Sequence, residues 1–108
     1  MNFSIEAIPY FKKRAKRLTK KHPSLKQELN ELGKELSGNP KQGIPIGHDC
    51  YKIRLAIKSK GKGKSGGARI ITHIYVSQTT VYLLTIYDKS EQENISDKEL
   101  QKLLKMIE

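Results

Sequence analysis

The stretch YKIRLAIKSKGKGKSGGARI (residues 51–70) joins two strand-like segments through a loop of glycine and lysine. In its first part apolar residues alternate with mostly basic ones, which is typical of a strand with one buried and one solvated face. No acidic residue occurs between Asp49 and Asp88, and that interval holds seven cations: Lys52, Arg54, Lys58, Lys60, Lys62, Lys64 and Arg69. We therefore expect a sheet with one strongly cationic face whose ligand is a polyanion.

Two helices are predicted before this stretch. The first runs from Pro9 to the break at His22 and carries many basic residues, and the second has leucines at positions 25, 29, 32 and 36. Their short connection predicts an antiparallel helical hairpin. The segment 38–47 is rich in Gly and Pro and is expected to be a loop. Residues 2–7 alternate like a short edge strand, with an early helix start after Ser4 as the alternative.

Two further strands and a third helix are predicted after the loop. ARIITHIYVS (68–77) and VYLLTIY (81–87) complete an antiparallel meander with the strand from residue 51. Ser96 is followed three residues later by Glu99, a capping box that begins a helix with an apolar stripe from Leu100 to Ile107. We expect the helices to pack on one face of the sheet, through Leu25, Leu29, Leu32, Tyr51, Ile53, Leu55, Ile70, Ile74 and Leu104.

The resulting fold class is α+β in one domain over residues 1–108, an N-terminal helical hairpin on an antiparallel sheet with a C-terminal helix (β-α-α-β-β-β-α). Twenty-one basic and eleven acidic residues give a formal charge of +10, which attracts nucleic acid, anionic membrane or an acidic protein. The single Cys50 excludes an internal disulfide, and no apolar run suits a signal peptide or membrane span. We expect a cytoplasmic protein.

The cations of the strand and the loop are candidates for phosphate binding. Lys52 and Arg54 project from one strand face about 6.6 Å apart, and Arg69 joins them if Ile70 faces the helices. Together these three side chains would bind a phosphodiester. The alternative is that they form a solvated strand face without a ligand. Four loop lysines would add contacts to an RNA backbone from a mobile flap, namely Lys58, Lys60, Lys62 and Lys64. The alternative for this loop is a long flexible hairpin.

Other chemistry has weaker support in the sequence. Gly63-Lys64-Ser65 resembles the end of a phosphate loop, but Lys58 stands where that pattern requires glycine, and a strand follows, so we reject a nucleotide triphosphate site. The histidines have no metal-ligand spacing, and no metal site is expected. His48 and Cys50 favour a buried structural thiol over a catalytic dyad, while His73 shares the parity of Arg69 and is a candidate for proton transfer.

Three residues at the end of the last strand are candidates for proton transfer. Tyr87, Lys89 and Glu91 share one parity if the extended conformation persists. Neighbouring cations are expected to lower the pKa of tyrosine and lysine there. The alternative is a polar loop that leads into the capped helix.

Three segments, DCYKIRL (49–55), GGARIIT (66–72) and VYLLTIYDKSE (81–91), follow a basic helical hairpin in this order. Together they resemble the RelE/ParE superfamily of bacterial type II toxins, particularly its RelE- and HigB-like members. This resemblance implies a small α+β ribonuclease that cleaves messenger RNA in the ribosomal A site without a metal or other cofactor. It also implies three partners: the ribosome, the mRNA and a cognate antitoxin.

The resemblance assigns roles by position. Lys52 and Arg54 match the two cations of the family's YKIK strand, Arg69 matches the arginine that stabilises the phosphate, and Lys89 lies in the family's basic segment. The sequence departs from RelE at Ser90 and Ser96, where RelE has an arginine and a tyrosine. Tyr87 is the candidate replacement for that tyrosine, which leaves the general acid to be chosen among Tyr87, Lys89 and Glu91.

Two alternatives to an mRNA interferase stay open at this point. A ParE-like inhibitor of DNA gyrase would use the same fold without nuclease activity, and a plain RNA-binding module would bind without cleaving. Retention of Lys52, Arg54 and Arg69 favours the ribonuclease over both.

Overall fold

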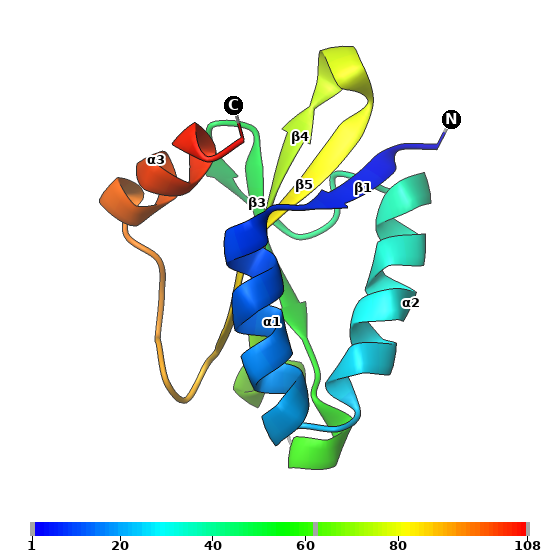
Figure 1. Cartoon of the computed structure of the whole chain (residues 1–108), viewed down its shortest axis with the longest axis vertical. Coiled ribbons are helices and arrows are strands. Elements are labelled where there is room, and N and C mark those ends of the chain that lie inside the picture. Colours follow the sequence, from blue (N-terminus) through cyan, green and yellow to red (C-terminus); the bar gives the residue numbers. More distant parts are fainter. Residues whose placement is uncertain (1, 62, 108) are drawn as a thin grey trace.

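The computed structural model describes residues 2–61 and 63–107, in which three helices surround one five-stranded sheet (Figure 1). The helices are α1 (Pro9–Lys21), α2 (Leu25–Gly38) and α3 (Asp97–Lys105). The strands are β1 (Ser4–Ala7), β2 (Ile44–Gly47), β3 (Cys50–Leu55), β4 (Ala68–Tyr75) and β5 (Thr80–Asp88). The α+β class and the helical hairpin agree with the prediction.

The strands are arranged in the order β1-β5-β4-β3-β2. β3, β4 and β5 form the predicted antiparallel meander, and β1 adds to one edge, parallel to β5. The prediction of a loop over residues 38–47 was wrong in part, because Ile44 and Pro45 pair with Lys52 and Tyr51 and form β2. An edge strand tolerates proline because one side of it needs no backbone donor.

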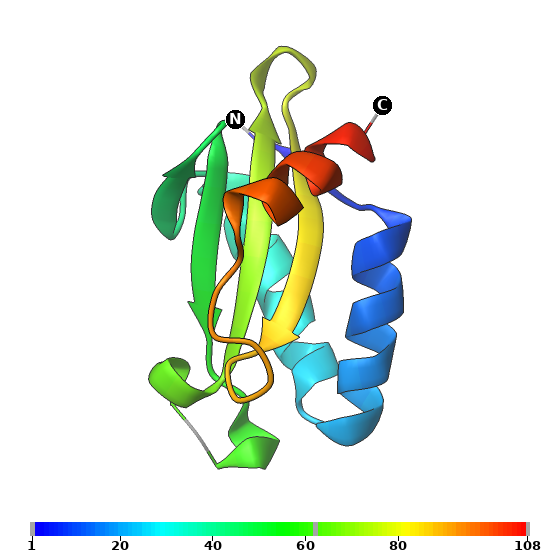
Figure 2. The same ribbon diagram turned by 90° about the vertical axis from the view of Figure 1, so that its left-hand side faces the viewer.

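The sheet is covered on both faces. Ile70 and Ile71 are neighbours on β4 and therefore point to opposite faces, and both are fully buried. α1 and α2 lie on one face, and α3 lies across the other (Figure 2). The expectation that the helices share one face was therefore wrong. The apolar stripe of α3, with Leu100 and Leu103 buried, covers the second apolar surface of the sheet.

Local sequence signals explain the ends of the helices. Pro9 occupies the first turn of α1, where its missing N–H is not needed. The Ser96 hydroxyl accepts a hydrogen bond from the backbone N–H of Glu99 at 3.1 Å, which confirms the predicted cap of α3. α2 ends at Gly38, immediately before the Asn39-Pro40 break.

The glycine-lysine loop is anchored to the body of the protein. The Ser59 backbone N–H donates to the Ser24 hydroxyl at 2.9 Å, and the Lys58 backbone N–H donates to the Glu28 carboxylate at 2.8 Å. At the other end, a Cβ atom on Gly67 would lie 2.1 Å from the Leu55 carbonyl oxygen, so only glycine fits there. Ser24 and α2 thus bind the start of the loop, and Gly67 at its end packs closely against β3.

Candidate active site

A row of three residues crosses the central strands on the sheet face that α3 partly covers. Arg54 on β3 pairs with Arg69 on β4, which pairs with Tyr87 on β5. Directly paired residues project from the same face of a sheet, and Lys52 projects from that face because it precedes Arg54 by two positions. The strand register therefore brings Lys52, Arg54, Arg69 and Tyr87 to one face.

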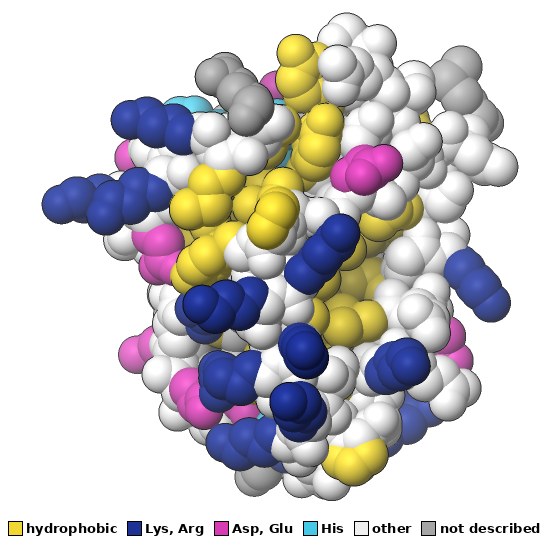
Figure 3. All heavy atoms as spheres, in the orientation of Figure 1, with side chains coloured by type: hydrophobic (Ala, Val, Ile, Leu, Met, Phe, Trp, Pro, Cys, Tyr) yellow, Lys and Arg dark blue, Asp and Glu magenta, His cyan; other side chains and the backbone are white. Residues whose placement is uncertain are grey.

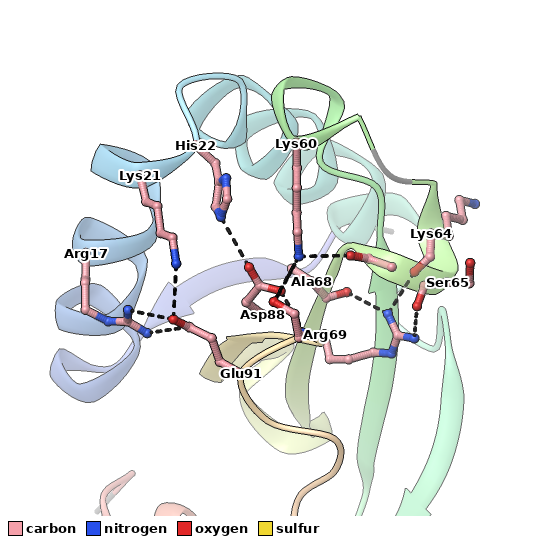
Figure 4. A network of polar contacts seen from close by, with 12 residues as sticks. Arg17, Lys21, His22, Lys60, Lys64, Ser65, Ala68, Arg69, Asp88 and Glu91 are labelled. Carbon is pink, nitrogen blue, oxygen red and sulfur yellow. Dashed lines mark hydrogen bonds and ion pairs between the residues drawn. The ribbon is translucent and has the colours of Figure 1, made fainter.

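The cations of this face differ in accessibility. Arg54 is exposed, and Lys52 is half-buried in a recess beside the start of α3, with its Nζ atom 3.5 Å from Asn94 Oδ1. Arg69 is only 5% exposed, so the expectation that it lies on an open face was wrong. Its guanidinium donates to the backbone carbonyls of Lys64 at 2.8 Å, Ser65 at 3.1 Å and Ala68 at 3.2 Å (Figure 4). Arg69 thus supplies hydrogen bonds that backbone carbonyl groups at the end of the loop require. The periodicity of the sequence does not reveal these bonds.

Tyr87 lies beneath this surface. It is 1% exposed, and its hydroxyl has no hydrogen-bond partner among the residues that the structure describes. Burial raises the pKa of Tyr87, and the opposing effect of the Arg69 charge is smaller. The expectation that neighbouring cations lower this pKa was therefore wrong, because desolvation of the phenolate outweighs them. The hydroxyl keeps its proton at neutral pH.

Lys89 and Glu91 diverge after β5. The backbone N–H groups of Glu91 and Gln92 both donate to the Asp88 carbonyl, which turns the chain out of the extended conformation. Lys89 Nζ lies 3.4 Å from the Glu93 carbonyl oxygen, whereas the Glu91 carboxylate is bound by Arg17 and Lys21 of α1. The predicted common parity of Tyr87, Lys89 and Glu91 is therefore lost. Figure 4 shows Glu91 turned toward α1 and the Arg69 guanidinium turned toward Ser65.

The lysines of the loop fall into different environments. Lys58 and Lys64 are exposed and share a shallow groove with Arg54, whose other wall carries the α2 residues Glu28, Glu31 and Glu35. The Lys60 side chain is only 16% exposed and is bound to Asp88, so it is withdrawn from any ligand on the surface. Lys62 lies outside the described residues. The accessible cations of this groove are therefore Arg54, Lys58 and Lys64.

A buried network around Asp88 was not predicted. Asp88 is 1% exposed and accepts hydrogen bonds from Lys60 Nζ at 2.5 Å and from the Ser90 hydroxyl at 2.8 Å, with His22 Nε2 at 3.2 Å (Figure 4). Burial alone would raise the pKa of Asp88, but the hydrogen bonds from Lys60 and Ser90 hold it well below its ordinary value. An acidic residue at the end of an apolar strand is the one sequence signal for this network.

The histidines and the thiol form a structural cluster. Cys50 is buried, and burial raises the pKa of its thiol to about 12, so it stays protonated. His73 Nδ1 lies 2.9 Å from the His48 carbonyl oxygen and 3.6 Å from Cys50 Sγ. The prediction of a buried structural cysteine is confirmed. The Nδ1 atom of His73, the residue predicted as a candidate for proton transfer, is engaged in this cluster.

Residues 2–61 and 63–107 contain neither a candidate metal site nor a helix suited to a membrane. No group of three or more His, Cys, Asp or Glu side chains is placed to hold a metal ion. No helix in these ranges is long and apolar enough to cross a membrane.

Comparison with known proteins identifies the class of this small basic α+β protein. The family model described as "RelE toxin of RelE / RelB toxin-antitoxin system" matches residues 8–108. The chain therefore belongs to the RelE toxin family, which implies an antitoxin as its partner.

Solved structures of the Escherichia coli toxin RelE are similar in fold. A mutant with two arginines replaced by alanine, in the free state, matches at 17% identity with a TM-score of 0.63, covering 100% of both chains. The isolated toxin matches at 16% identity with a TM-score of 0.62, covering 98% of this chain and 99% of the other. At these sequence identities the similarity shows the fold alone, and it confirms the predicted RelE-like fold class.

Proposed function

We propose that the protein is a ribosome-dependent endoribonuclease that cleaves mRNA in the A site and thereby inhibits translation. The observation that carries the proposal is the convergence of Lys52, Arg54 and Arg69 on one face of a RelE-family fold. Lys52 and Arg54 are the accessible members of this set, and both lie on the same strand. Their spacing of about 6.6 Å suits two contacts with one phosphodiester group and its neighbour.

The reaction uses the RNA itself as nucleophile. The 2′-hydroxyl gives its proton to solvent water as it attacks the adjacent phosphorus, the bond from phosphorus to the 5′-oxygen breaks, and a 2′,3′-cyclic phosphate forms. Lys52 and Arg54 stabilise the charge that develops on the phosphate oxygens. Lys89 is the candidate to protonate the leaving 5′-oxygen, because the Tyr87 hydroxyl is buried beneath the surface and Glu91 is held by α1. No metal or cofactor takes part in this scheme.

Dependence on the ribosome follows from the shape of the site. The accessible cations lie in shallow recesses at the surface, so they contact phosphate without aligning the 2′-hydroxyl with the phosphorus. Alignment of the two reacting atoms supplies a large part of such rate enhancements. The ribosome, which holds mRNA in a fixed path, would supply this orientation.

Arg69 acts in this scheme as a positioning residue. Its guanidinium holds the carbonyls of Lys64 and Ser65, which places the Lys64 side chain beside Arg54. Its buried charge adds to the positive potential of the face. Arg69→Lys should keep that charge while losing the fork geometry, so partial retention of activity would separate the two contributions.

The proposal is tested with translating ribosomes. Wild-type protein should cut mRNA in the A site, and Lys52→Ala and Arg54→Ala should each lower the cleavage rate about 10²-fold or more. Lys34→Ala, at an exposed position on α2, is the matched control and should cleave normally. Uncut message under conditions where E. coli RelE cleaves would refute the proposal. Inhibition of gyrase supercoiling without RNA cleavage would assign the ParE-like alternative instead.

A further inference from the structure

Lys52 has a neutral partner in the recess beside α3. Cations are abundant on the surface of this protein, as Figure 3 shows over α1, so charge alone does not distinguish Lys52 from the others. Its Nζ atom lies 3.5 Å from Asn94 Oδ1. Asn94 belongs to the segment 89–96, which Figure 2 shows in orange between the end of β5 and the start of α3. The contact therefore joins the Lys52 ammonium group to a segment 42 residues further along the chain.

The Asn94 side chain is itself fixed by local hydrogen bonds. Its Oδ1 atom accepts a hydrogen bond from the backbone N–H of Ile95 at 2.9 Å, and its backbone carbonyl accepts one from Gln92 Nε2 at 3.0 Å. The bond from Ile95 sets the orientation of the amide group, because the NH2 group of asparagine cannot accept a hydrogen bond. Lys52 therefore faces the amide oxygen, which is an acceptor without a net charge.

One carboxylate also lines this recess, and it is bound elsewhere. Asp97 Oδ1 lies 3.5 Å from His48 Nε2, and Asp97 Oδ2 accepts a hydrogen bond from Gln101 Nε2 at 3.5 Å. Within residues 2–61 and 63–107, no ion pair joins Lys52 to an acidic side chain. An ammonium group has three donors. One bond to Asn94 thus leaves two donors and the full charge of Lys52 for a ligand.

We propose that Asn94 is a positioning residue for Lys52, whose ammonium group it holds in the recess with a neutral oxygen so that the positive charge stays available to a phosphate. A carboxylate at this position would hold Lys52 as well, but it would compete with the phosphate for the same charge. The inference rests on the proposed function for the identity of the phosphate, which is that of the mRNA. Phosphate binding by Lys52 can be measured without cleavage.

The first test is a double-mutant cycle on the binding of a short single-stranded DNA, which lacks the 2′-hydroxyl and is not cleaved. Affinity is measured by fluorescence anisotropy for wild type, Asn94→Ala, Lys52→Ala and the double variant. Asn94→Ala should weaken binding about two- to fivefold when Lys52 is present, because a hydrogen bond to its ammonium group is lost. It should have no effect in the Lys52→Ala protein, because the group that Asn94 positions is then absent.

The second test compares Asn94→Asp with Asn94→Ala in the same binding assay. Aspartate keeps the shape of asparagine and the acceptor for the Ile95 N–H, so a merely structural role of Asn94 would leave this variant like wild type. We expect it instead to bind about fivefold more weakly than wild type, because the new charge pairs with Lys52. Asn30→Asp, at an exposed position on α2, is the matched control and should bind normally. Thermal unfolding checks that every variant is folded.

Two outcomes would overturn the inference. Asn94→Ala could weaken binding equally with and without Lys52, or Asn94→Asp could bind the DNA as tightly as wild type does. Cleavage by translating ribosomes then separates this inference from the proposed function. Coupling of Asn94 to Lys52 in DNA binding, with no mRNA cleavage by wild type, would refute the proposed function alone. Cleavage by wild type without that coupling would refute this inference alone.

Discussion

Asp88 and Glu91 lie three residues apart at the end of β5, and each binds cations from distant segments. Asp88 is 1% exposed and joins Lys60 of the loop to His22 after α1. The Glu91 side chain is 36% exposed and contacts Arg17 and Lys21 on the surface of α1. The residue types and charges are alike, and the difference between the two sites is access of water.

Water access decides what each carboxylate does. Without water, loss of one partner leaves a buried charge unpaired, so Asp88 acts as a structural clamp on the loop. With water, the ion pairs of Glu91 contribute little to stability and are readily exchanged for another anion. One acidic residue therefore fixes the basic loop, and the other forms exchangeable ion pairs on a basic surface.

The largest expected effect comes from Asp88→Asn, which leaves Lys60 Nζ without its carboxylate. We expect the free energy of unfolding to fall by about 2 to 4 kcal/mol, measured by urea denaturation. Asp49→Asn makes the same change at an exposed position and should have almost no effect. Adding Lys60→Met to Asp88→Asn should restore part of the loss. Equal stability of Asp88→Asn and wild type would contradict the structural role of Asp88 and its contrast with Glu91.

Arg69→Ala tests the second anchor of the loop. Its removal takes the guanidinium donor away from the carbonyls of Lys64, Ser65 and Ala68, and we expect a cost of about 1 to 3 kcal/mol. Amide hydrogen exchange over residues 58–67 should become faster, because the loop opens locally. Unchanged exchange there would mean that the contacts of the loop with Asp88, Glu28 and Ser24 hold it without Arg69.

Lowering the pH should decrease the free energy of unfolding for the same reason as Asp88→Asn, but by a smaller amount. The pKa of Asp88 is depressed in the folded state, so its contribution to stability is present above the unfolded value of about 3.9 and is lost as the pH falls toward the folded value. The stability of wild type should therefore decline below about pH 4 more steeply than that of Asp88→Asn. Parallel pH profiles of the two proteins would contradict the assignment.

The smallest effect on stability is expected from Glu91→Gln. Its exposed ion pairs with Arg17 and Lys21 should contribute too little for a measurable change in thermal midpoint. A loss of stability comparable to that of Asp88→Asn would erase the contrast between the two carboxylates.

Most of the secondary structure could be predicted from the sequence. Helical spacing of leucines located α2, and alternation of apolar and basic residues located β3. β2 was missed because the Gly and Pro residues around Ile44 signal a loop, and its pairing with Lys52 depends on a strand further along the chain. The position of α3 on the second sheet face was missed for a similar reason, since an apolar stripe does not say which surface it will cover.

The candidate site could be predicted only as a set of charges. Alternation placed Lys52 and Arg54 on one strand face, and the register added Arg69. The burial of Arg69 and Lys60 could not be read from spacing, because it depends on loop carbonyls and on Asp88, which lies 28 residues from Lys60. Glu91 was misplaced because the chain turns after Asp88, where the extended parity ends.

The sequence by itself determined the α+β class, the density of cations and the strand on which Lys52 and Arg54 lie, because these follow from local periodicity and charge. Only the tertiary structure decided which cations meet a ligand and which hold the fold. Burial makes hydrogen-bond satisfaction obligatory, so Arg69 and Lys60 are committed to internal oxygen atoms, and their neighbours Arg54 and Lys64 stay at the surface.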